Sequence, residues 1–346
     1  MSLKEYKSPN NLQKYAIKDP EKVLEDHLYK KYGQRFSDYR KKYLSNITDG
    51  RQQVLNDYPN TVILELVNRC NLECTMCFQG FRNDAKKYTL ENDIIDKIFK
   101  DFKENQLSAL MLSISEPLLF KNIGQIFERA KEANIMDIFL FTNGILLNEK
   151  NINLILSSGV TRLFISVDAS SEEIYNKVRI PVSERLKNNM NRLSDLENNI
   201  KNFMRLRNEY NKELPLVRTS FVSLDKNKHE IEKFKSKWMN VVDSIEFQKE
   251  VSINAYSDLE NKKASIVENK DYFCSEPWGQ ITIYSDGTVT PCCNTFGRNL
   301  SVGNIRYNSI KEIWNNEKMR KIRNEFLINK PNNICATCIN NTNEKI

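Results

Sequence analysis

The sequence predicts an α/β protein in which a partial (β/α)6 barrel precedes a small cysteine-rich domain. Between residues 61 and 249, short runs of β-branched and aromatic residues alternate with longer stretches whose apolar residues recur with helical spacing. Strands that alternate with helices form a parallel sheet with helices on its outer face, and six such units make an open barrel. Beyond residue 249 this alternation stops, and five of the eight cysteines follow.

The elements of the barrel can be placed from this alternation. We expect strands over 62–67, 108–114, 136–141, 163–167, 216–222 and 244–247. We expect helices between and after them, over 92–104, 123–133, 148–158, 184–210 and 229–239. In such a barrel the active site lies at the carboxyl ends of the strands.

Three domains are expected along the chain. Residues 1–58 form a helical N-terminal extension of one or two short helices that packs outside the barrel, and residues 59–249 form the barrel itself. Residues 250–346 contain a polar linker, over 250–272, and the small second domain. In that domain we expect short strands near 281–284 and 288–290, a turn at 285–287 and a helix over 310–326.

The composition is that of an ordinary globular protein, with 40% apolar and 28% charged residues. The net charge of +7 comes from interspersed basic and acidic residues, which indicates a solvated surface and no nucleic-acid partner. Residues 1–9 lack the apolar core of a secretory signal, and no run of 18 apolar residues is present to span a membrane. We therefore expect a cytoplasmic protein, in which eight cysteines indicate metal or redox chemistry.

The first group of cysteines follows the first predicted strand. Cys70, Cys74 and Cys77 have the spacing C-x3-C-x2-C, and three thiolates on one loop can bind three irons of a cubane cluster. The fourth iron is then open to a chelating small molecule. The alternatives are a zinc knuckle or three buried thiols, although zinc takes four ligands and no histidine or fourth cysteine stands nearby.

This spacing, after the first strand of a partial barrel, resembles the radical S-adenosylmethionine (SAM) superfamily. The resemblance implies a TIM-like barrel and a catalytic 4Fe-4S cluster held by three cysteines and by the amino and carboxylate groups of SAM. It also implies that a reducing partner, such as flavodoxin or ferredoxin, reduces the cluster. SAM is then cleaved to a 5′-deoxyadenosyl radical, which takes a hydrogen atom from an unactivated substrate carbon.

Segments at the next three strand ends carry the same resemblance. Segment 113–118 (Ser-Ile-Ser-Glu-Pro-Leu) stands where the family has Gly-Gly-Glu-Pro, with Ile114 and Ser115 in place of the glycines. Segments 141–144 (Phe-Thr-Asn-Gly) and 165–169 (Ile-Ser-Val-Asp-Ala) resemble the third and fourth strand ends. Taken alone, 142–144 also fits a plain turn, and Asp168 fits a helix N-cap.

The resemblance assigns roles in SAM binding to these segments. It implies that Glu116 binds the methionyl ammonium, since a carboxylate makes a charge-assisted hydrogen bond to a cation. It implies that Met76 packs on the adenine, that Ser166 binds the ribose or carboxylate, that Asp168 faces the ribose or substrate and that Arg179 pairs with a carboxylate. The full set expected at the cofactor is Met76, Ser115, Glu116, Thr142, Asn143, Ser166, Asp168 and Arg179.

The second group of cysteines is Cys274, Cys292, Cys335 and Cys338. Their spacing resembles the Twitch domain, a shortened α+β form of the SPASM domain that carries an auxiliary 4Fe-4S cluster. Four thiolates would saturate this cluster, so the resemblance implies electron transfer and loop anchoring rather than substrate binding at iron. A structural zinc site with four cysteines is the alternative. The neighbouring Cys293 is either a buried thiol beside the cluster or a hydrogen-atom donor to a substrate radical.

Two enzymatic functions and one non-catalytic function are compatible with these motifs. The ligand spacing resembles that of aminocyclitol dehydrogenases, which favours oxidation of a sugar or cyclitol alcohol with the auxiliary cluster as electron acceptor. The alternatives are epimerisation or crosslinking of a peptide, and a metal-binding protein without activity. Weak candidates for catalysis are Asp168, Arg218, Lys249 and Cys293; Arg218, Gln248 and Lys249 are expected near strand ends, where a base is needed.

Overall fold

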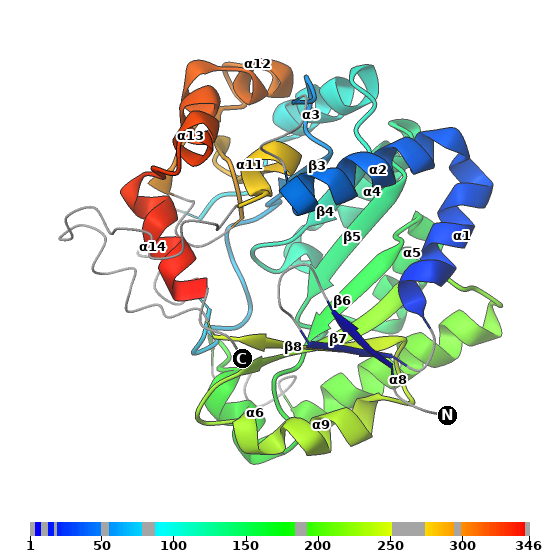
Figure 1. The fold of residues 1–346 in the computed structure, drawn as a ribbon. Coiled ribbons are helices and arrows are strands. Elements are labelled where there is room, and N and C mark those ends of the chain that lie inside the picture. Colours follow the sequence, from blue (N-terminus) through cyan, green and yellow to red (C-terminus); the bar gives the residue numbers. More distant parts are fainter. Residues whose placement is uncertain are drawn as a thin grey trace.

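The computed structural model describes residues 4–7, 13–16, 19–49, 55–77, 87–183, 192–250, 274–293 and 299–342. They build one sheet of eleven strands in the order β1-β2-β8-β7-β6-β5-β4-β3-β9-β10-β11 (Figure 1). The six neighbouring strands from β3 to β8 are parallel. Among the described strands, β1 and β11 end the sheet without pairing to each other, so the barrel is partial and the predicted fold class is confirmed.

All six predicted barrel strands are present, with small shifts at their ends. They are β3 (Thr61–Leu64), β4 (Ala109–Leu112), β5 (Asp137–Thr142), β6 (Arg162–Ser166), β7 (Leu216–Ser223) and β8 (Ser244–Lys249). Strand β3 is buried along its whole length, and it pairs with β4 at one edge and with β9 at the other. This explains its continuous apolar run, since a strand that is covered on both faces shows no alternation.

The predicted helices cover the outer face of the sheet. They are α3 (Asn92–Glu104), α4 (Ile123–Glu132), α5 (Glu149–Ser158), α8 (Leu193–Glu209) and α9 (Ile231–Trp238). The first eight residues of the helix expected over 184–210 lie outside the described residues. A further short helix, α6 (Glu172–Val178), was not expected from the sequence; the Ser171 side chain caps its start by accepting from the backbone N–H of Ile174.

The N-terminal extension contains more than the expected helices. Helices α1 (Pro20–Tyr32) and α2 (Gln34–Asp49) are present, but strands β1 (Lys4–Lys7) and β2 (Gln13–Ala16) form a hairpin that the sequence analysis missed. Strand β2 pairs antiparallel with β8 and so adds a seventh strand to that side of the barrel. The expectation of a purely helical extension was therefore wrong.

Helices α1 and α2 cover the amino-terminal end of the barrel, opposite the expected active site (Figure 1). Their Leu24, Leu28 and Phe36 pack with Ala109 and Met136, which lie at the starts of β4 and β5. Ionic contacts hold the same end together. Both oxygens of Glu21 in α1 accept from Arg162 Nη1 at 2.8 Å, and Arg162 also faces the fully buried Asp137.

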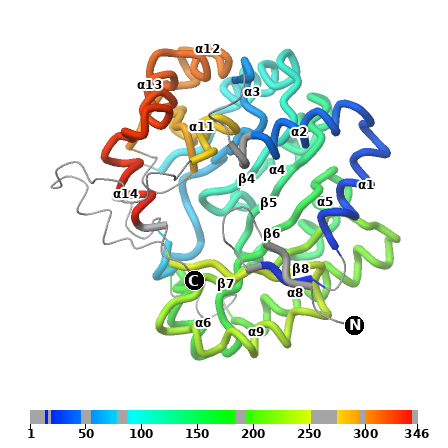
Figure 2. The backbone as a smooth tube through the Cα atoms, in the orientation of Figure 1, coloured from blue at the N-terminus to red at the C-terminus, as the bar shows by residue number. Residues whose placement is uncertain are grey.

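The C-terminal part begins with α11 (Glu276–Gly279) and the strands β9 (Gln280–Ile283), β10 (Thr288–Thr290) and β11 (Gly303–Asn304). Helices α12 (Ile310–Trp314), α13 (Glu317–Leu327) and α14 (Asn333–Thr342) follow, on the side of the molecule shown in orange and red in Figure 2. The expected single helix over 310–326 is wrong, because Asn316 caps a new helix by accepting from the backbone N–H of Met319. The expected linker lies almost wholly outside the described residues. Among the described residues, no helix has the length and apolar content to cross a bilayer.

Candidate functional site

The loop that carries the first three cysteines leaves β3 and is held against the segment that follows α6. A short antiparallel ladder joins them, with Leu72 opposite Pro181. Its hydrogen bonds run from Glu73 N to Ile180 O (2.7 Å), from Thr75 N to Val178 O (3.1 Å) and from Val182 N to Asn71 O (3.2 Å). The loop is therefore fixed by backbone bonds to an element that begins at the end of the fourth barrel strand.

The three thiols of this loop fit a metal cluster by their chemistry. Burial, followed by the nearby Glu116 carboxylate, raises the pKa of Cys70 to about 12. Burial raises the pKa of Cys74 to about 11, although Arg179 opposes the rise. Buried thiols that neighbour one another ionise only when a cation compensates them, and iron in a cluster supplies that charge. A cubane takes one thiolate at each of three corners, so its ligands need not converge on one point, and among the described residues no three metal-binding side chains do.

Glu116 follows β4 and contacts residues at the end of β5. Its carboxylate, 1% exposed, accepts from Leu118 N (3.1 Å), Thr142 Oγ1 (2.9 Å) and Asn143 N (2.8 Å). Burial raises the pKa of Glu116 to about 7, against the effect of these three donors. A nearby cation favours the ionised form of a carboxyl group whose pKa is raised by burial. An ammonium group supplies such a charge and donates a hydrogen bond to the carboxylate.

The backbone of segment 113–118 keeps a conformation that suits glycine although the residue is isoleucine. Ile114 has φ 86°, in the left-handed region that β-branched residues rarely adopt. Its neighbour Ser115 donates from Oγ to Glu65 Oε1 at 3.1 Å, at the end of β3. The turn is therefore kept with Ile114 and Ser115 in place of the family's glycines, and the cost is a strained backbone at Ile114.

The turn after β5 ties the second and third strand ends to the cysteine loop. Asn143 Nδ2 donates to Asn71 Oδ1 at 2.6 Å and lies 3.7 Å from Cys70 Sγ. Gly144 has φ 76°, and a Cβ atom there would lie 2.5 Å from Leu196 Cδ1 and 2.9 Å from Ile165 Cγ2. Only glycine fits this turn, because both the conformation and the space exclude a side chain.

The fourth strand end supplies an ion pair that reaches the cysteine loop. Asp168, with φ 61° and 1% exposure, accepts from Val222 N at 2.7 Å and pairs with Arg179. The same guanidinium places Nη1 3.4 Å from Cys74 Sγ. Burial raises the pKa of Asp168, and Arg179 opposes that rise. Arg179 was expected to pair with a carboxylate, and in this structure it pairs with that of Asp168 while also contacting Cys74.

Other expected site residues lie in different places. Ser166 is half-buried at the end of β6, and Met76 packs beside Leu72 within the cysteine loop. Lys249 is exposed at the end of β8. The expectation that Arg218 lies near the carboxyl end of its strand is wrong. It is the third residue of β7, nearer the start of the strand, and it pairs with Glu246.

Sequence reasoning did not single out Glu246, a buried carboxylate on β8. It lies in the middle of β8 between the buried Ile245 and Phe247 and is 1% exposed. The strand reads Ser-Ile-Glu-Phe-Gln-Lys, in which polar and apolar residues alternate, so no sequence signal marked this carboxylate as buried.

The second group of cysteines gathers in the C-terminal part of the chain. Cys274 precedes α11, Cys292 and Cys293 follow β10, and Cys335 and Cys338 lie in α14. Burial raises the pKa of Cys338 to about 12, and Cys335 and Glu276 contribute to the rise. Cys274 and Cys292 have raised pKa values for the same reason. These thiols come from three separate segments and lie close enough to influence one another.

The two cysteine regions are joined by the sheet itself. Strand β9 pairs in parallel with β3 along its length, from Thr61 with Gln280 to Leu64 with Ile283. Just beyond, Glu65 Oε2 accepts from both the backbone N–H and the hydroxyl of Ser285, at 3.1 and 2.8 Å. The strand that leads into the first cysteine loop is thus hydrogen-bonded to the hairpin that leads into the second group.

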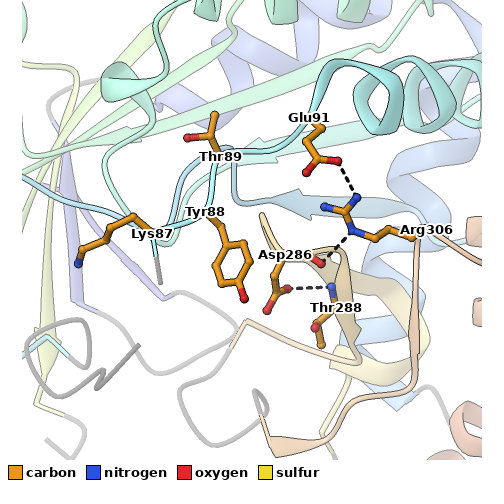
Figure 3. A pocket seen from close by; sticks show the side chains of 7 residues that line it. All are labelled: Lys87, Tyr88, Thr89, Glu91, Asp286, Thr288 and Arg306. Atoms are coloured by element: carbon orange, nitrogen blue, oxygen red, sulfur yellow. Dashed lines mark hydrogen bonds and ion pairs between the residues drawn. The ribbon is translucent and has the colours of Figure 1, made fainter. Parts of the chain in front are cut away.

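A polar cavity of about 540 Å³ lies at this junction (Figure 3). One wall is the segment from Lys87 to Glu91, and the other is the turn and strand of the β9–β10 hairpin with Arg306. Glu91 and Arg306 form an ion pair of 2.7 Å across it. The cavity is large enough for a small molecule, and its lining comes from both cysteine-bearing parts of the chain.

The comparisons with known proteins agree with this organisation. The family profile described as radical SAM superfamily matches residues 64–237, and that described as iron–sulfur cluster-binding domain (SPASM) matches residues 274–339. A probable GTP 3′,8-cyclase of Methanococcus maripaludis is 35% identical over 117 residues, which cover 34% of this chain and only 39% of that protein.

Two solved structures show similar chains. SuiB of Streptococcus suis aligns with a TM-score of 0.58 and 14% identity, covering 85% of this chain and 72% of that one. BtrN in complex with AdoMet and 2-DOIA aligns with a TM-score of 0.48 and 16% identity, covering 81% and 92%. The profile over residues 64–237 spans half of the chain, and it contains the loop, the turns and the ion pair described above. The protein therefore belongs to the radical SAM superfamily, and with its SPASM domain it binds SAM and two 4Fe-4S clusters.

Proposed function

We propose that the protein oxidises an alcohol carbon of a small polyhydroxylated substrate, a sugar or cyclitol, to a ketone. The observation that carries this proposal is the pairing of β3 with β9, which links the catalytic loop directly to the auxiliary domain with its four-cysteine set. A cluster with four protein ligands has no free iron for a substrate, so its role is to accept or donate an electron. A two-electron oxidation needs such an acceptor after the first hydrogen atom has been removed.

The residues of the candidate site take distinct roles in this proposal. Cys70, Cys74 and Cys77 hold the catalytic cluster, and Cys274, Cys292, Cys335 and Cys338 hold the auxiliary one. When bound, SAM and the catalytic cluster supply a 5′-deoxyadenosyl radical. Glu116 faces the methionyl ammonium, and Thr142 and Asn143 hold its carboxylate in place. Ser115, Ser166 and Met76 line the cofactor, while Arg179 and Asp168 fix the cysteine loop.

The polarity of the barrel interior supports a hydroxyl-rich substrate. Glu246, Gln248 and Arg218 form a hydrogen-bonded group on strands β7 and β8. Carboxylate, amide and guanidinium groups together offer both acceptors and donors to hydroxyl groups. A reducing partner such as flavodoxin or ferredoxin is expected to supply the electron that starts each turnover.

The test uses anaerobically reconstituted protein with SAM, dithionite and carbon-deuterated myo-inositol or glucosamine. Oxidation moves deuterium irreversibly into 5′-deoxyadenosine and yields a product that lacks two hydrogens. A product of unchanged mass with solvent hydrogen at the reacting carbon would instead indicate epimerisation and would refute the proposal. Peptide substrates form the parallel arm, since SAM cleavage coupled only to a peptide would also refute it.

A further inference from the structure

The residue on β8 that sequence reasoning missed lies at the level of the SAM motifs. In the register of the sheet, Ser166 pairs with Ser220, and Ser220 pairs with Glu246. On the other side Thr142 pairs with Ile165, so Asn143, the next residue, comes level with Ser166. Residues paired across neighbouring strands share one face of the sheet. Glu246 therefore stands level with the residues assigned to the cofactor, two strands away from Ser166.

The side chain of Glu246 faces the interior of the barrel. On the opposite face of β8, Phe247 packs against Phe234 of helix α9, with ring centroids 5.8 Å apart. Glu246 instead pairs with Arg218, whose guanidinium lies 3.5 Å from the ring centroid of Phe164. Phe164 precedes Ser166 by two residues on β6 and so shares its face. These contacts put the carboxylate on the face that the helices do not cover.

The two oxygens of the Glu246 carboxylate have different surroundings. Oε2 accepts from Arg218 Nη1 at 2.7 Å and lies 3.4 Å from Lys14 Nζ, which the added strand β2 brings directly opposite. Oε1 accepts from the half-buried Gln248 Nε2 at 2.7 Å. Gln248 is two residues nearer the carboxyl end of β8. One oxygen is thus anchored by two cations, and the other is turned toward the carboxyl end of the strand.

Stability alone does not require this arrangement. A buried ion pair contributes little more than apolar side chains of the same volume would, because both charges lose their hydration. The neighbouring layer of the barrel is already filled by aromatic rings, with Phe141 and Phe164 centroids 4.8 Å apart. A reactive role for Oε1 therefore explains better than stability why a carboxylate is held at the level of the cofactor residues.

Building on the proposed oxidation, we infer that Glu246 is the catalytic base that takes the hydroxyl proton of the substrate. The substrate hydroxyl replaces the Gln248 amide at Oε1. The hydrogen atom on the alcohol carbon goes to the 5′-deoxyadenosyl radical, the hydroxyl proton goes to Oε1, and the remaining electron goes to the auxiliary cluster. The C–O single bond becomes C=O, so atoms and electrons balance. Arg218 and Lys14 are positioning residues that hold Oε2.

The discriminating experiment compares Glu246→Gln with Asp243→Asn in the reconstituted holoenzyme. Both variants remove a carboxylate from an ion pair with arginine, but Asp243 pairs with Arg207 and precedes the start of β8. The probe is whichever of carbon-deuterated myo-inositol or glucosamine the unmodified protein oxidises. General-base catalysis contributes about 10²–10⁴-fold, so Glu246→Gln is expected to lower ketone formed per 5′-deoxyadenosine by about 10²-fold. Freeze-quench EPR should show a substrate radical that accumulates, and Asp243→Asn should retain the unmodified ratio.

Two outcomes overturn the inference in distinguishable ways. If the unmodified protein forms ketone and Glu246→Gln forms it at the same ratio, the base is another group while the proposed function stands. If the unmodified protein forms no ketone from either probe, the oxidation and the base are both refuted. Glu246→Asp covers the case in which Glu246→Gln fails to fold: this shorter carboxylate should lower the ketone ratio without abolishing it, and a ratio equal to that of the unmodified protein at the same cluster content would exclude proton transfer at this position.

Discussion

Replacing Asp168 by asparagine tests whether the ion pair at the fourth strand end holds the first cysteine loop. Asparagine keeps the size of the side chain, tolerates the left-handed backbone at φ 61° and still accepts from Val222 N. It removes only the charge that faces Arg179. The guanidinium, which is 9% exposed, then remains buried without its carboxylate partner and is no longer oriented toward Cys74.

The expected size of the effect follows from burial. Removing one partner of a buried ion pair costs about 3–5 kcal/mol. Unfolding entropy of about 2.1 cal/mol/K per residue, over 346 residues, converts this loss to a fall in Tm of about 4–7 °C for a single transition. The effect on the cluster follows from the orientation of Arg179, because losing a partner that orients a metal ligand weakens metal binding by about 10–100-fold.

Asp243→Asn provides a matched control. Asp243 also accepts from a strand N–H, that of Val217, and also pairs with an arginine, Arg207, but at the other end of β7. It is 23% exposed, so the loss of Tm should be similar or smaller. The measurements are thermal unfolding of the cluster-free protein by circular dichroism and, for reconstituted protein, iron retained against a chelator together with the EPR signal of the reduced cluster. If Asp168→Asn retains iron as well as Asp243→Asn does, the coupling of this ion pair to the cluster is refuted.

Three further predictions concern the turn, the cofactor and the auxiliary ligands. Gly144→Ala should destabilise the protein by about 1–3 kcal/mol more than Gly159→Ala in chemical denaturation, because both glycines have positive φ but only the Cβ at Gly144 meets atoms closer than 3 Å. Burial raises the pKa of Glu116 to about 7, so an ammonium group that binds beside it should lower that pKa and release close to one proton at pH 6. Calorimetry in buffers of different ionisation enthalpy measures the proton release, which should vanish above pH 8. Cys292→Ala should lose the iron of one cluster while Cys293→Ala keeps both, and equal iron contents would mean that the ligand assignment is wrong.

The sequence was sufficient for the barrel strands and the order of the motifs along them. A short apolar run predicts each parallel strand. The segments with Glu116, Asn143 and Asp168 come directly after such runs. Because parallel strands end at one edge, their proximity follows from the pattern alone. The predicted residues Glu116, Thr142 and Asn143 do contact one another.

What the sequence could not provide were contacts between distant segments. Arg179 reaches Cys74, which is 105 residues earlier in the chain, and no local pattern encodes that approach. The hairpin with Lys14 consists of short polar strands that lack a clear alternation, so only its pairing with β8 reveals it. The position of Arg218 was misjudged because strand ends are uncertain in sequence, and a few residues decide which end of a barrel a side chain occupies. The domain boundaries at 58 and 249 stay predictions.

The continuity of β3 with β9 also limits how this protein can be dissected. A fragment that ends near residue 250 would strip β3 of one neighbour and expose a row of unpaired backbone groups on an apolar strand. Such an edge attracts other chains and promotes aggregation. Studies of the catalytic cluster by itself will therefore succeed better with the full chain and cysteine substitutions in the auxiliary set than with a shortened protein.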